Sequence, residues 1–467
     1  MTLGTGTRKI IKDIRFWILL FFLLRLIGIE NPPLEISHNW RQSLTNMIAR
    51  NFVETDANIL YPRIDMAGNA SGIIGSEFPF FNYLIYLLSL AFGFDHWYGR
   101  LINLIVSSFG IYFFYRLVEK LCNARIAFNA AIVLLASIWF AFSRKVMPDT
   151  FSVSFVIIGL FYCYDYLISG SKWKLLLYFC FASLGMLCKI PALCLLSPLA
   201  ILLFIDTIDQ RRKIHVYLIS LISIITVSLW YFYWVPHLLA TYNYPLYFPK
   251  GIMEGIKEIL PLLPQLFEKF YFSSLSSYVA FAFFIVGIVL LIRSKDKQLK
   301  FGIGLITLVF LIFVIKTGSI FPLHNYYIIP FTPVMALIAG YGIEKFSLKY
   351  QYLIIILISF EGIANQQHDF FIKDSEKYKL SLEVIADTYI GKNKLVVING
   401  GQSPQQIYFL HRKGWTVESD FINKENLDSL KTLGASFFIL NKKVFDTNIE
   451  YYSLLASTES FNIYKIE

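Results

Sequence analysis

The chain is short of charged residues, which make up 16% of its 467 residues, against about 25% in an ordinary soluble protein. Hydrophobic residues make up 56%, and the mean hydropathy is +0.57. A single water-soluble core does not account for so large an apolar share. The composition therefore excludes an ordinary soluble domain and predicts a polytopic membrane protein.

Cysteine is also scarce, and the signatures of several enzyme classes are missing. The five cysteines lie in or beside apolar segments, and none forms a CxxC pair or another metal-ligand spacing. We interpret them as small buried hydrophobic residues. The sequence contains no HExxH, GxSxG, Walker or haem motif, so none of the chemistries that those motifs mark is indicated.

Apolar segments recur along the chain. A membrane span needs about 20 mostly apolar residues, and about eleven segments approach this length. They are 14–29, 100–119, 125–143, 150–168, 173–188, 190–206, 214–235, 275–292, 300–317, 326–343 and 350–364. The first follows a basic stretch and has no clear small-residue cleavage site, so we predict an uncleaved anchor.

Positive charge is unevenly distributed between the loops. The net charge is 42 − 32 = +10, which in a soluble protein would suggest nucleic-acid binding. Here every other loop is short and basic, as at 116–125, 172–174, 211–213, 293–300 and 345–349. Lys and Arg are retained on the cytoplasmic side of a membrane. We therefore expect the N-terminus inside and no nucleic-acid partner.

In this topology the first long outer loop covers residues 30–99. Residues 38–53 have the apolar spacing of an amphipathic helix that lies on the membrane face. Residues 78–93 are apolar but short, so we expect an interfacial or re-entrant helix, with a true span as the alternative.

The last segment changes character. Residues 394–399 and 436–441 are typical of buried strands, and residues 404–413 between them of a helix. We predict an all-α transmembrane domain over 1–365, which includes the first outer loop, and an extracytoplasmic α/β domain over 366–467.

Charged and polar side chains gather at the predicted outer membrane face, where charge is costly and usually has a function. Acids and bases together favour a site for an anionic lipid head group with a proton-accepting carboxylate nearby. We expect these side chains to meet in one pocket at the extracytoplasmic boundary of the bilayer. The set comprises His38, Arg41, Gln42, Asp65, Glu77, Arg100, Arg144, Asp149, Lys189 and His324.

Two of the acids have competing interpretations. Glu77 lies where the loop re-enters the membrane, and burial there would raise its pKa and make it a general base. The alternative is an interfacial carboxylate paired with an arginine. Asp149 follows Pro148 at the start of a predicted span, so capping of a helix N-terminus is the alternative to a functional role.

The basic and aromatic candidates are equally open. Lys189 lies in a tight outer turn, where its ammonium group would contact phosphate as a point charge or extend to the interface. His324, Tyr326 and Tyr327 precede a span. They suit phosphate or sugar binding, and an aromatic belt is the alternative for the tyrosines.

Taken together and in this order, the local motifs resemble the GT-C superfamily of membrane glycosyltransferases. The closest likeness is to the branch that contains the protein O-mannosyltransferases and the aminoarabinose transferases of lipid A. The resemblance covers about residues 10–345. It rests on residues 38–42 (HNWRQ), 48–52 (IARNF), 77–79 (EFP), 99–101 (GRL), 147–149 (MPD), Lys189 and 324–327 (HNYY).

The resemblance implies an activity and a set of partners. Enzymes of this branch take a sugar from a polyprenyl-phosphate donor and transfer it, with inversion, to a glycan, lipid or protein acceptor outside the membrane. It implies a bacterial cytoplasmic (inner) membrane. No cofactor is firmly predicted. A divalent ion stays open, although the acids show no diagnostic spacing for one.

It also implies roles for single residues. Asn39 stands where the superfamily usually has an aspartate, and an amide cannot act as a base. The base is then Glu77 or Asp65, with Asp149 assisting. One group of residues would bind and stabilise the leaving phosphate: Arg100, Arg144, Lys189, His324 and Tyr327. The first-loop motif would complete the site with His38, Trp40, Arg41 and Gln42.

Three other functions remain open on the sequence. A flippase or transporter of lipid-linked sugars explains the spans and charges, but the long first loop less well, and no inverted repeat is visible. A glycan polymerase or ligase also acts outside on polyprenyl-linked sugars. A non-catalytic sugar-lipid binder would fit Asn39.

Overall fold

The computed structural model describes residues 11–243 and 250–466. The chain divides into two compact units. The first, which we call the helical unit, comprises Met1–Ile29, Arg100–Phe232 and Tyr247–Phe370. The second, which we call the mixed unit, comprises Glu30–Gly99, Tyr233–Leu246 and Phe371–Glu467. The break after Phe370 lies close to the predicted boundary at residue 365, and the first outer loop groups with the C-terminal segment. The predicted division into domains stays a prediction.

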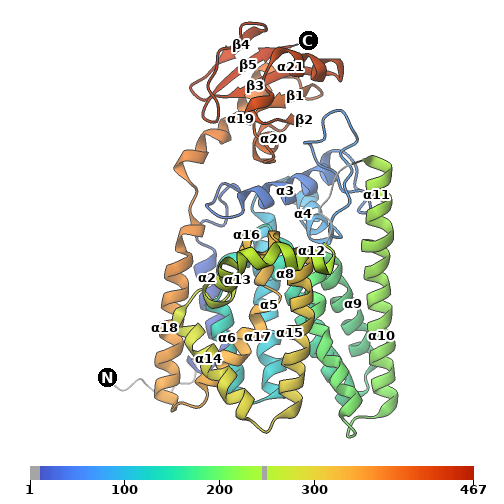
Figure 1. Cartoon of the computed structure of the whole chain (residues 1–467), viewed down its shortest axis with the longest axis vertical. Helices are drawn as coiled ribbons and strands as arrows, with labels where there is room; N and C mark the ends of the chain where they lie inside the picture. The colour runs from blue at the N-terminus through green and yellow to red at the C-terminus, as the bar shows by residue number, and fades with distance from the viewer. Residues whose placement is uncertain (1–10, 244–249, 467) are drawn as a thin grey trace. The chain divides into compact units, whose positions relative to one another are not determined.

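Most of the long helices of the helical unit run side by side, whereas α12 and α13 lie across them (Figure 1). The bounds of its helices are α2 Ile14–Arg25, α5 Tyr98–Leu121, α6 Ala124–Ala136, α7 Trp139–Phe142, α8 Pro148–Ser169, α9 Lys172–Cys188, η1 Ile190–Phe204, α10 Gln210–Leu229, η2 Trp230–Trp234, α12 Ile252–Ile259, η3 Leu260–Leu262, α13 Leu263–Glu268, η4 Lys269–Ser273, α14 Tyr278–Arg293, α15 Lys297–Thr317, α16 Ile320–Leu323, η5 Asn325–Ile328, α17 Thr332–Ile343, α18 Leu348–Gln366 and η6 Gln367–Phe370.

Each of the predicted apolar segments coincides with one or more of these helices, and the chain is an integral membrane protein. Within the described residues, four helices are long and apolar enough to span a membrane: Tyr98–Leu121, Pro148–Ser169, Gln210–Tyr242 and Lys297–Thr317. A fifth is added if Ile252–Ser273 and Tyr278–Arg293, bent by 98°, count as one. The number that passes this test is therefore smaller than predicted.

Breaks within the apolar segments explain the difference. Ser137 ends α6 in an extended conformation before α7 begins. Pro198 lies inside η1, where it lacks the N–H that an α-helix needs. Pro333 stands in the first turn of α17, so that helix begins well inside the predicted segment.

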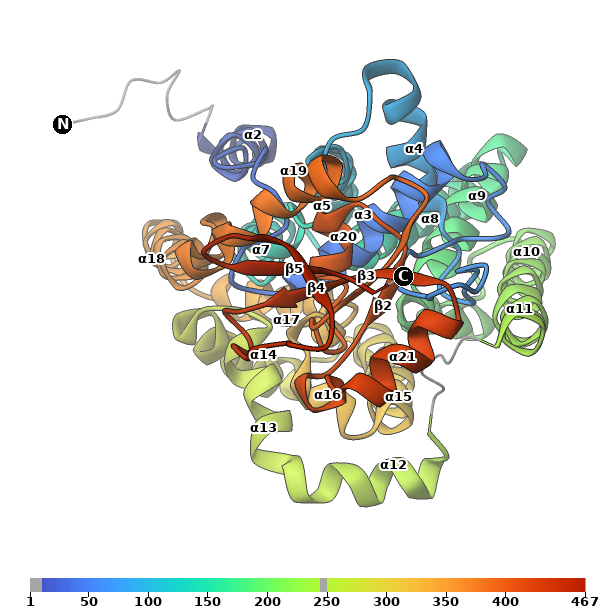
Figure 2. The ribbon, with the colours of Figure 1, turned by 90° about the horizontal axis from the view of Figure 1, so that it is seen from above.

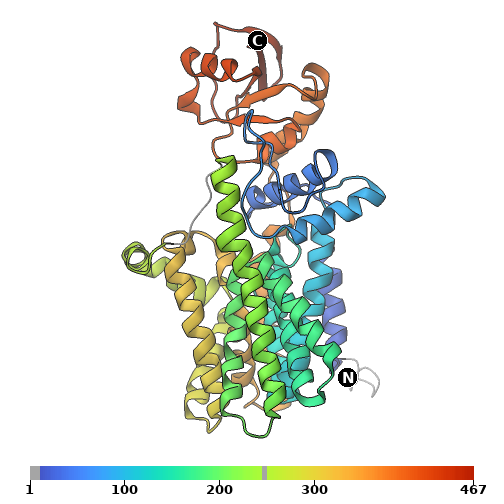
Figure 3. The same ribbon diagram turned by 90° about the vertical axis from the view of Figure 1, so that its right-hand side faces the viewer.

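Glycines bring the helices of this unit into close contact. A Cβ added at Gly287 of α14 would lie 2.0 Å from the carbonyl oxygen of Ile338 in α17, and one at Gly185 of α9 would lie 2.8 Å from the carbonyl oxygen of Ser152 in α8. The helices α8 and α9 lie side by side in both views (Figure 1, Figure 3). Small residues allow such close backbone packing, which helix association in lipid requires.

The mixed unit contains a five-stranded sheet in the order β2-β1-β3-β5-β4. The strand β1 pairs in parallel with β2 and β3, whereas β5 is antiparallel to β3 and β4. Its elements are α3 Asn39–Glu54, α4 Phe80–Phe92, α11 Val235–Tyr242, η7 Asp374–Ser381, α19 Leu382–Tyr389, β1 Leu395–Ile398, α20 Gln405–Leu410, β2 Gly414–Thr416, η8 Ser419–Phe421, α21 Lys424–Thr432, β3 Ala435–Asn441, β4 Ser453–Ser457 and β5 Phe461–Lys465.

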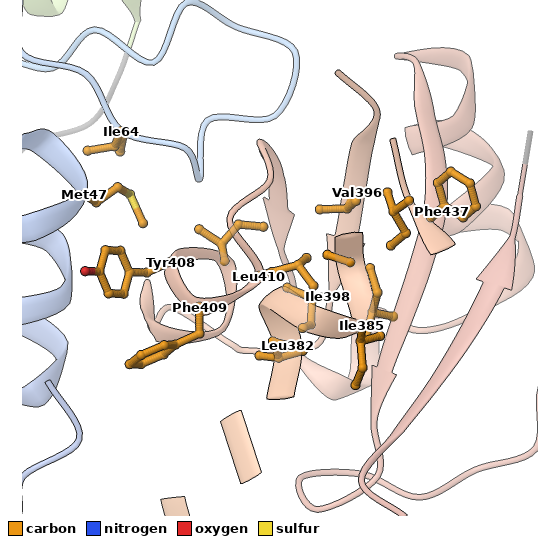
Figure 4. Packing of buried hydrophobic residues seen from close by; sticks show 14 of the residues in the cluster. Met47, Ile64, Leu382, Ile385, Val396, Ile398, Tyr408, Phe409, Leu410 and Phe437 are labelled. Carbon is orange, nitrogen blue, oxygen red and sulfur yellow. The ribbon is translucent and has the colours of Figure 1, made fainter. Parts of the chain in front are cut away.

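The two faces of the sheet are covered by different helices (Figure 2). Val396 and Ile398 of β1 point into a core with α19, α20 and α3, whereas Val397 points into a second core with α21. Met47 and Ile64 of the first outer loop join the first of these cores, beside Tyr408 of α20 (Figure 4). The first outer loop and the C-terminal segment therefore share one hydrophobic core.

Most predictions for this unit are confirmed. The helix predicted over 38–53 is α3, and the predicted strands and helix of the C-terminal segment are β1, β3 and α20. At 13 residues, α4 is too short to cross a bilayer, which favours the predicted interfacial or re-entrant helix over a true span. The strands β2, β4 and β5 were not predicted.

Candidate functional site

In the helical unit, the turn between α7 and α8 and the first turn of α8 together carry three charged residues, of which Arg144 and Asp149 were predicted site residues. Pro148 occupies the first turn of α8, and Asp149 follows it there, where a proline has no N–H to lose and an acid is favoured by the helix dipole. Arg144 and Lys145 precede them in the turn. All three charged side chains are buried, which is costly unless each has a partner.

Asp149 lies beside Lys189. The Lys189 ammonium nitrogen is 3.8 Å from Asp149 Oδ1, and it lies 5.4 Å and 6.0 Å from the ring centroids of Tyr326 and Tyr327. The His324 ring stacks on Tyr326 with centroids 5.2 Å apart. We call these five residues the Lys189 cluster. Four of the predicted site residues, from three separate parts of the chain, meet in it.

Arg100 and Arg144 make a different set of contacts. Arg144 donates hydrogen bonds to the carbonyl oxygens of Arg25 at 3.0 Å and Ile27 at 2.7 Å. Arg100 donates to those of Gly28 and Ile29, each at 3.3 Å. Helix C-termini leave carbonyl groups without intrahelical partners. These two predicted phosphate ligands therefore bind the chain that leaves α2.

Further buried charges surround the same turn. Arg25 donates to the hydroxyl oxygens of Ser143 at 2.5 Å and Ser108 at 3.3 Å. The Lys145 ammonium nitrogen lies 3.5 Å from Asp369 Oδ1. The buried charges of this region, each at most 9% exposed, are the cations Arg25, Arg100, Arg144, Lys145 and Lys189 and the carboxylates Asp149 and Asp369.

The buried charges of this part of the helical unit thus comprise five cations and two carboxylates. Buried charges need opposite charges or strong hydrogen bonds. Backbone carbonyls supply part of the compensation.

The first-loop motif lies in the mixed unit, at the start of α3. His38 adopts the left-handed conformation, with φ of 59°, directly before the helix. Arg41 donates to Glu77 Oε1 at 2.6 Å, and the Glu77 side chain is 24% exposed. Trp40 is exposed. Glu77 is thus an arginine-paired carboxylate that water can still reach.

A carboxylate that was not predicted lies in this region. Gln42 donates to Glu35 Oε2 at 2.9 Å, and Glu35 is 1% exposed. The backbone around it pairs with the start of the C-terminal segment, where Glu35 forms a bridge with Ile372. The sequence pattern that could have identified Glu35 is an acid between two apolar residues shortly before the first-loop motif. It lies near the position where Asn39 replaces the usual aspartate.

Asp65 joins the first outer loop to the C-terminal segment. Its two carboxylate oxygens accept hydrogen bonds from Arg50 at 2.9 Å and Asn51 at 2.8 Å. Its backbone carbonyl accepts from the Gly414 N–H at 2.9 Å. Arg50 also donates to the Tyr408 carbonyl at 3.1 Å. These contacts support a structural role for Asp65 and leave Glu77 as the better candidate base.

The predicted single pocket is not tested, because its residues are divided between the two units. The helical unit brings together Asp149, Lys189, His324 and Tyr327, and the mixed unit pairs Arg41 with Glu77. Within residues 11–243 and 250–466, no three His, Cys, Asp or Glu side chains are arranged to hold a metal ion.

Residues 76–233 match the family model described as dolichyl-phosphate-mannose-protein mannosyltransferase. Among solved structures, ArnT from Cupriavidus metallidurans bound to undecaprenyl phosphate aligns with a TM-score of 0.67 and 11% identity, over 96% of this chain and 97% of that one. The apo structure of the same ArnT aligns with a TM-score of 0.64 at the same identity and coverage.

The archaeal oligosaccharyltransferase AglB from Archaeoglobus fulgidus, in complex with an inhibitory peptide and a dolichol-phosphate, aligns with a TM-score of 0.56 and 11% identity. That alignment covers 91% of this chain and 69% of AglB. No curated protein sequence matches the chain. The chain has the GT-C fold, and the resemblance stated from its sequence is confirmed.

Proposed function

We propose that the chain is a GT-C glycosyltransferase that transfers a sugar from a polyprenyl-phosphate donor to an acceptor on the extracytoplasmic side of the membrane. The observation that carries this proposal is the Lys189 cluster, in which a buried ammonium group lies beside Asp149 and two tyrosine rings. An ammonium group binds phosphate as a point charge, and the phosphate of a lipid-linked donor remains at the bilayer. The matched ArnT structure holds undecaprenyl phosphate and the matched AglB structure a dolichol-phosphate.

In the donor site, Lys189 is the primary phosphate contact. It is buried beside Asp149, which orients its ammonium group, and beside two tyrosine rings that attract the cation. Arg100 and Arg144 add positive charge while they hold the chain after α2. Fixed positive charge at a leaving phosphate stabilises the transition state more than the ground state.

The reaction is an inverting displacement. The acceptor hydroxyl or amine attacks the anomeric carbon, a new bond to that carbon forms, and its bond to the phosphate oxygen breaks. The electron pair of the broken bond leaves with polyprenyl phosphate. The acceptor proton passes to Glu77, whose carboxylate is oriented by Arg41 and reachable from water.

The proposed location follows from the loop charges. Every other predicted loop is short and basic, so the N-terminus lies in the cytoplasm and residues 366–467 lie outside. We assign the membrane as the cytoplasmic membrane of a bacterium, as the resemblance implies. The acceptor is a glycan, lipid or protein component of the cell envelope.

The test is transfer by purified protein in lipid nanodiscs. Radiolabelled polyprenyl-phosphate hexose and pentose are offered with an envelope extract, and labelled product and released polyprenyl phosphate are counted. We expect Glu77→Gln and Lys189→Gln to lower the rate by about 10²–10⁴-fold. Lys213→Gln is the matched control, because Lys213 is a buried lysine on α10, outside the Lys189 cluster.

The outcomes separate the candidate functions. Wild-type rates in both Glu77→Gln and Lys189→Gln contradict the assigned roles. Movement of donor across the membrane without bond cleavage would favour a flippase. Turnover of polyprenyl diphosphate donors alone would favour a polymerase or ligase.

A further inference from the structure

Asn103 is a fully buried amide on α5 that faces the turn between α7 and α8. Its Nδ2 lies within hydrogen-bond distance of three carbonyl oxygens: Phe142 at 3.1 Å, Lys145 at 2.9 Å and Met147 at 3.1 Å. None of these three carbonyl groups is close to Asn103 in sequence, since the turn lies 39 to 44 positions further along the chain. The amide therefore ties α5 to most of the turn.

The other end of the amide is held as well. Asn103 Oδ1 accepts hydrogen bonds from the hydroxyl groups of Ser107 and Thr150, each at 2.9 Å. Ser107 lies one turn further along α5, and Thr150 lies in the first turn of α8. Because both of its ends are bonded, the Asn103 side chain has a fixed orientation.

The turn needs such a partner because it is buried and separates two helices. Buried carbonyls outside regular structure require donors from elsewhere. An asparagine side chain supplies two N–H donors and an acceptor from one planar group. An aspartate has the same shape but no donor when ionised, and a leucine has neither donor nor acceptor.

The contacted stretch carries three buried charged residues, of which Arg144 and Asp149 belong to the proposed donor site. Arg144, Lys145 and Asp149 all lie between Phe142 and Thr150, within the stretch that Asn103 contacts. We propose that Asn103 is a positioning residue, which sets the placement of these three side chains for the donor phosphate without touching the substrate. This inference rests on the proposed function.

Asn129 provides a matched control. It is a buried asparagine of the same unit, on α6, and its amide donates to Gln351 Oε1 at 3.0 Å. Its replacement by leucine removes a buried amide at a comparable position but leaves the turn intact. A general loss of packing or stability therefore affects both asparagines, whereas a positioning role is confined to Asn103.

The experiment compares Asn103→Asp, Asn103→Leu and Asn129→Leu in nanodiscs, by thermal unfolding, transfer kinetics and hydrogen exchange. We expect both Asn103 variants to lose about 10²-fold in kcat, as a misplacement of about 1 Å does, with a smaller change in the donor KM. Amide exchange of residues 142–150 should rise in the Asn103 variants and stay unchanged in Asn129→Leu. The control should keep its kcat even if its Tm falls equally.

Thr150→Val is the milder companion if either Asn103 variant fails to fold. It removes one bond to Oδ1 and should give a smaller loss of kcat, with raised exchange in the same stretch. Wild-type kcat and exchange in Asn103→Asp, or an equal kcat loss in Asn129→Leu at matched Tm, would overturn the inference. If wild type transfers from no donor, the proposed function fails, and the exchange of residues 142–150 alone then decides whether Asn103 holds the turn.

Discussion

The substitution Asp65→Asn separates a structural carboxylate from a catalytic one. Asp65 is paired with Arg50, and their side chains are 15% and 6% exposed. The asparagine keeps the shape and still accepts from Asn51. It loses the negative charge and turns one oxygen into a donor. Arg50 is left with the Tyr408 carbonyl and the Tyr408 ring, which lies 4.8 Å away.

The size of the effect follows from burial. A hydrogen bond to a charged group contributes about 1.5–3 kcal/mol, and removal of one partner of a buried pair costs about 3–5 kcal/mol. Because the substitution keeps the bond to Asn51, we expect a loss of about 2–3 kcal/mol from the stability of the contact between the first outer loop and the C-terminal segment. A catalytic base would instead contribute about 10²–10⁴-fold in rate.

Hydrogen exchange of two backbone amides measures the stability of this contact directly. The Gly414 N–H donates to the Asp65 carbonyl, and the Gly68 N–H donates to the Gly414 carbonyl. A loss of 2–3 kcal/mol should speed exchange at these two amides by roughly 30- to 150-fold, while kcat stays within about threefold of wild type. Asp56→Asn is the control, because the pair of Asp56 with Arg63 is more exposed and is worth at most about 1 kcal/mol.

The reasoning is refuted by the opposite pattern. If Asp65→Asn leaves the exchange of both amides unchanged and lowers kcat by about 100-fold or more, Asp65 is the base. The role proposed for Glu77 would then have to be withdrawn.

Two further predictions concern other buried contacts. The hydrogen bond to Glu54 raises the pKa of His411, burial opposes the rise, and a hydrogen bond to Glu383 adds to it. A raised pKa means that protonated His411 stabilises the folded state. This stabilisation is complete below about pH 6.5 and is lost as pH rises through the raised pKa. Thermal unfolding followed from about pH 5 to about pH 9 should show the loss in wild type and not in His411→Gln, and equal slopes would contradict it. Arg144→Lys should cost about 2–4 kcal/mol, because one ammonium group cannot replace the planar donors that reach two carbonyls at the end of α2. Unfolding in detergent measures this against Arg116→Lys, which alters a surface ion pair and should cost less than about 1 kcal/mol; equal losses would be inconsistent with the assigned contacts.

The membrane helices and the main strands were predictable because their signal is local. The composition of a long apolar segment predicts a membrane span, and the buried strands β1 and β3 each contain a continuous apolar stretch. The amphipathic spacing of residues 38–53 predicted α3. The strands β2 and β4 gave no such signal, because β2 has three residues and β4 is largely exposed.

The partners of the polar side chains were not predictable, because they depend on contacts between distant parts of the chain. Arg50 and the Tyr408 carbonyl that it binds are 358 positions apart. Nothing near Asp65 in the sequence distinguishes a carboxylate that fastens two segments from one that accepts a proton. Asn103 was overlooked for the same reason, since a single amide in an apolar helix has no motif.

The prediction of the cations as phosphate ligands shows where residue type stops being informative. An arginine at the end of a span serves equally well as a donor to phosphate or to backbone carbonyls, because both are oxygen acceptors of partial or full negative charge. Which acceptor it binds depends on what lies within about 3.5 Å. Four carbonyls at the end of α2 and directly after it lie within that range of Arg100 and Arg144, and no carbonyl position can be read from a sequence. Lys189 has a carboxylate and two rings as its neighbours instead. Among these cations, the structure therefore favours Lys189 for phosphate and the two arginines for shaping the site around it.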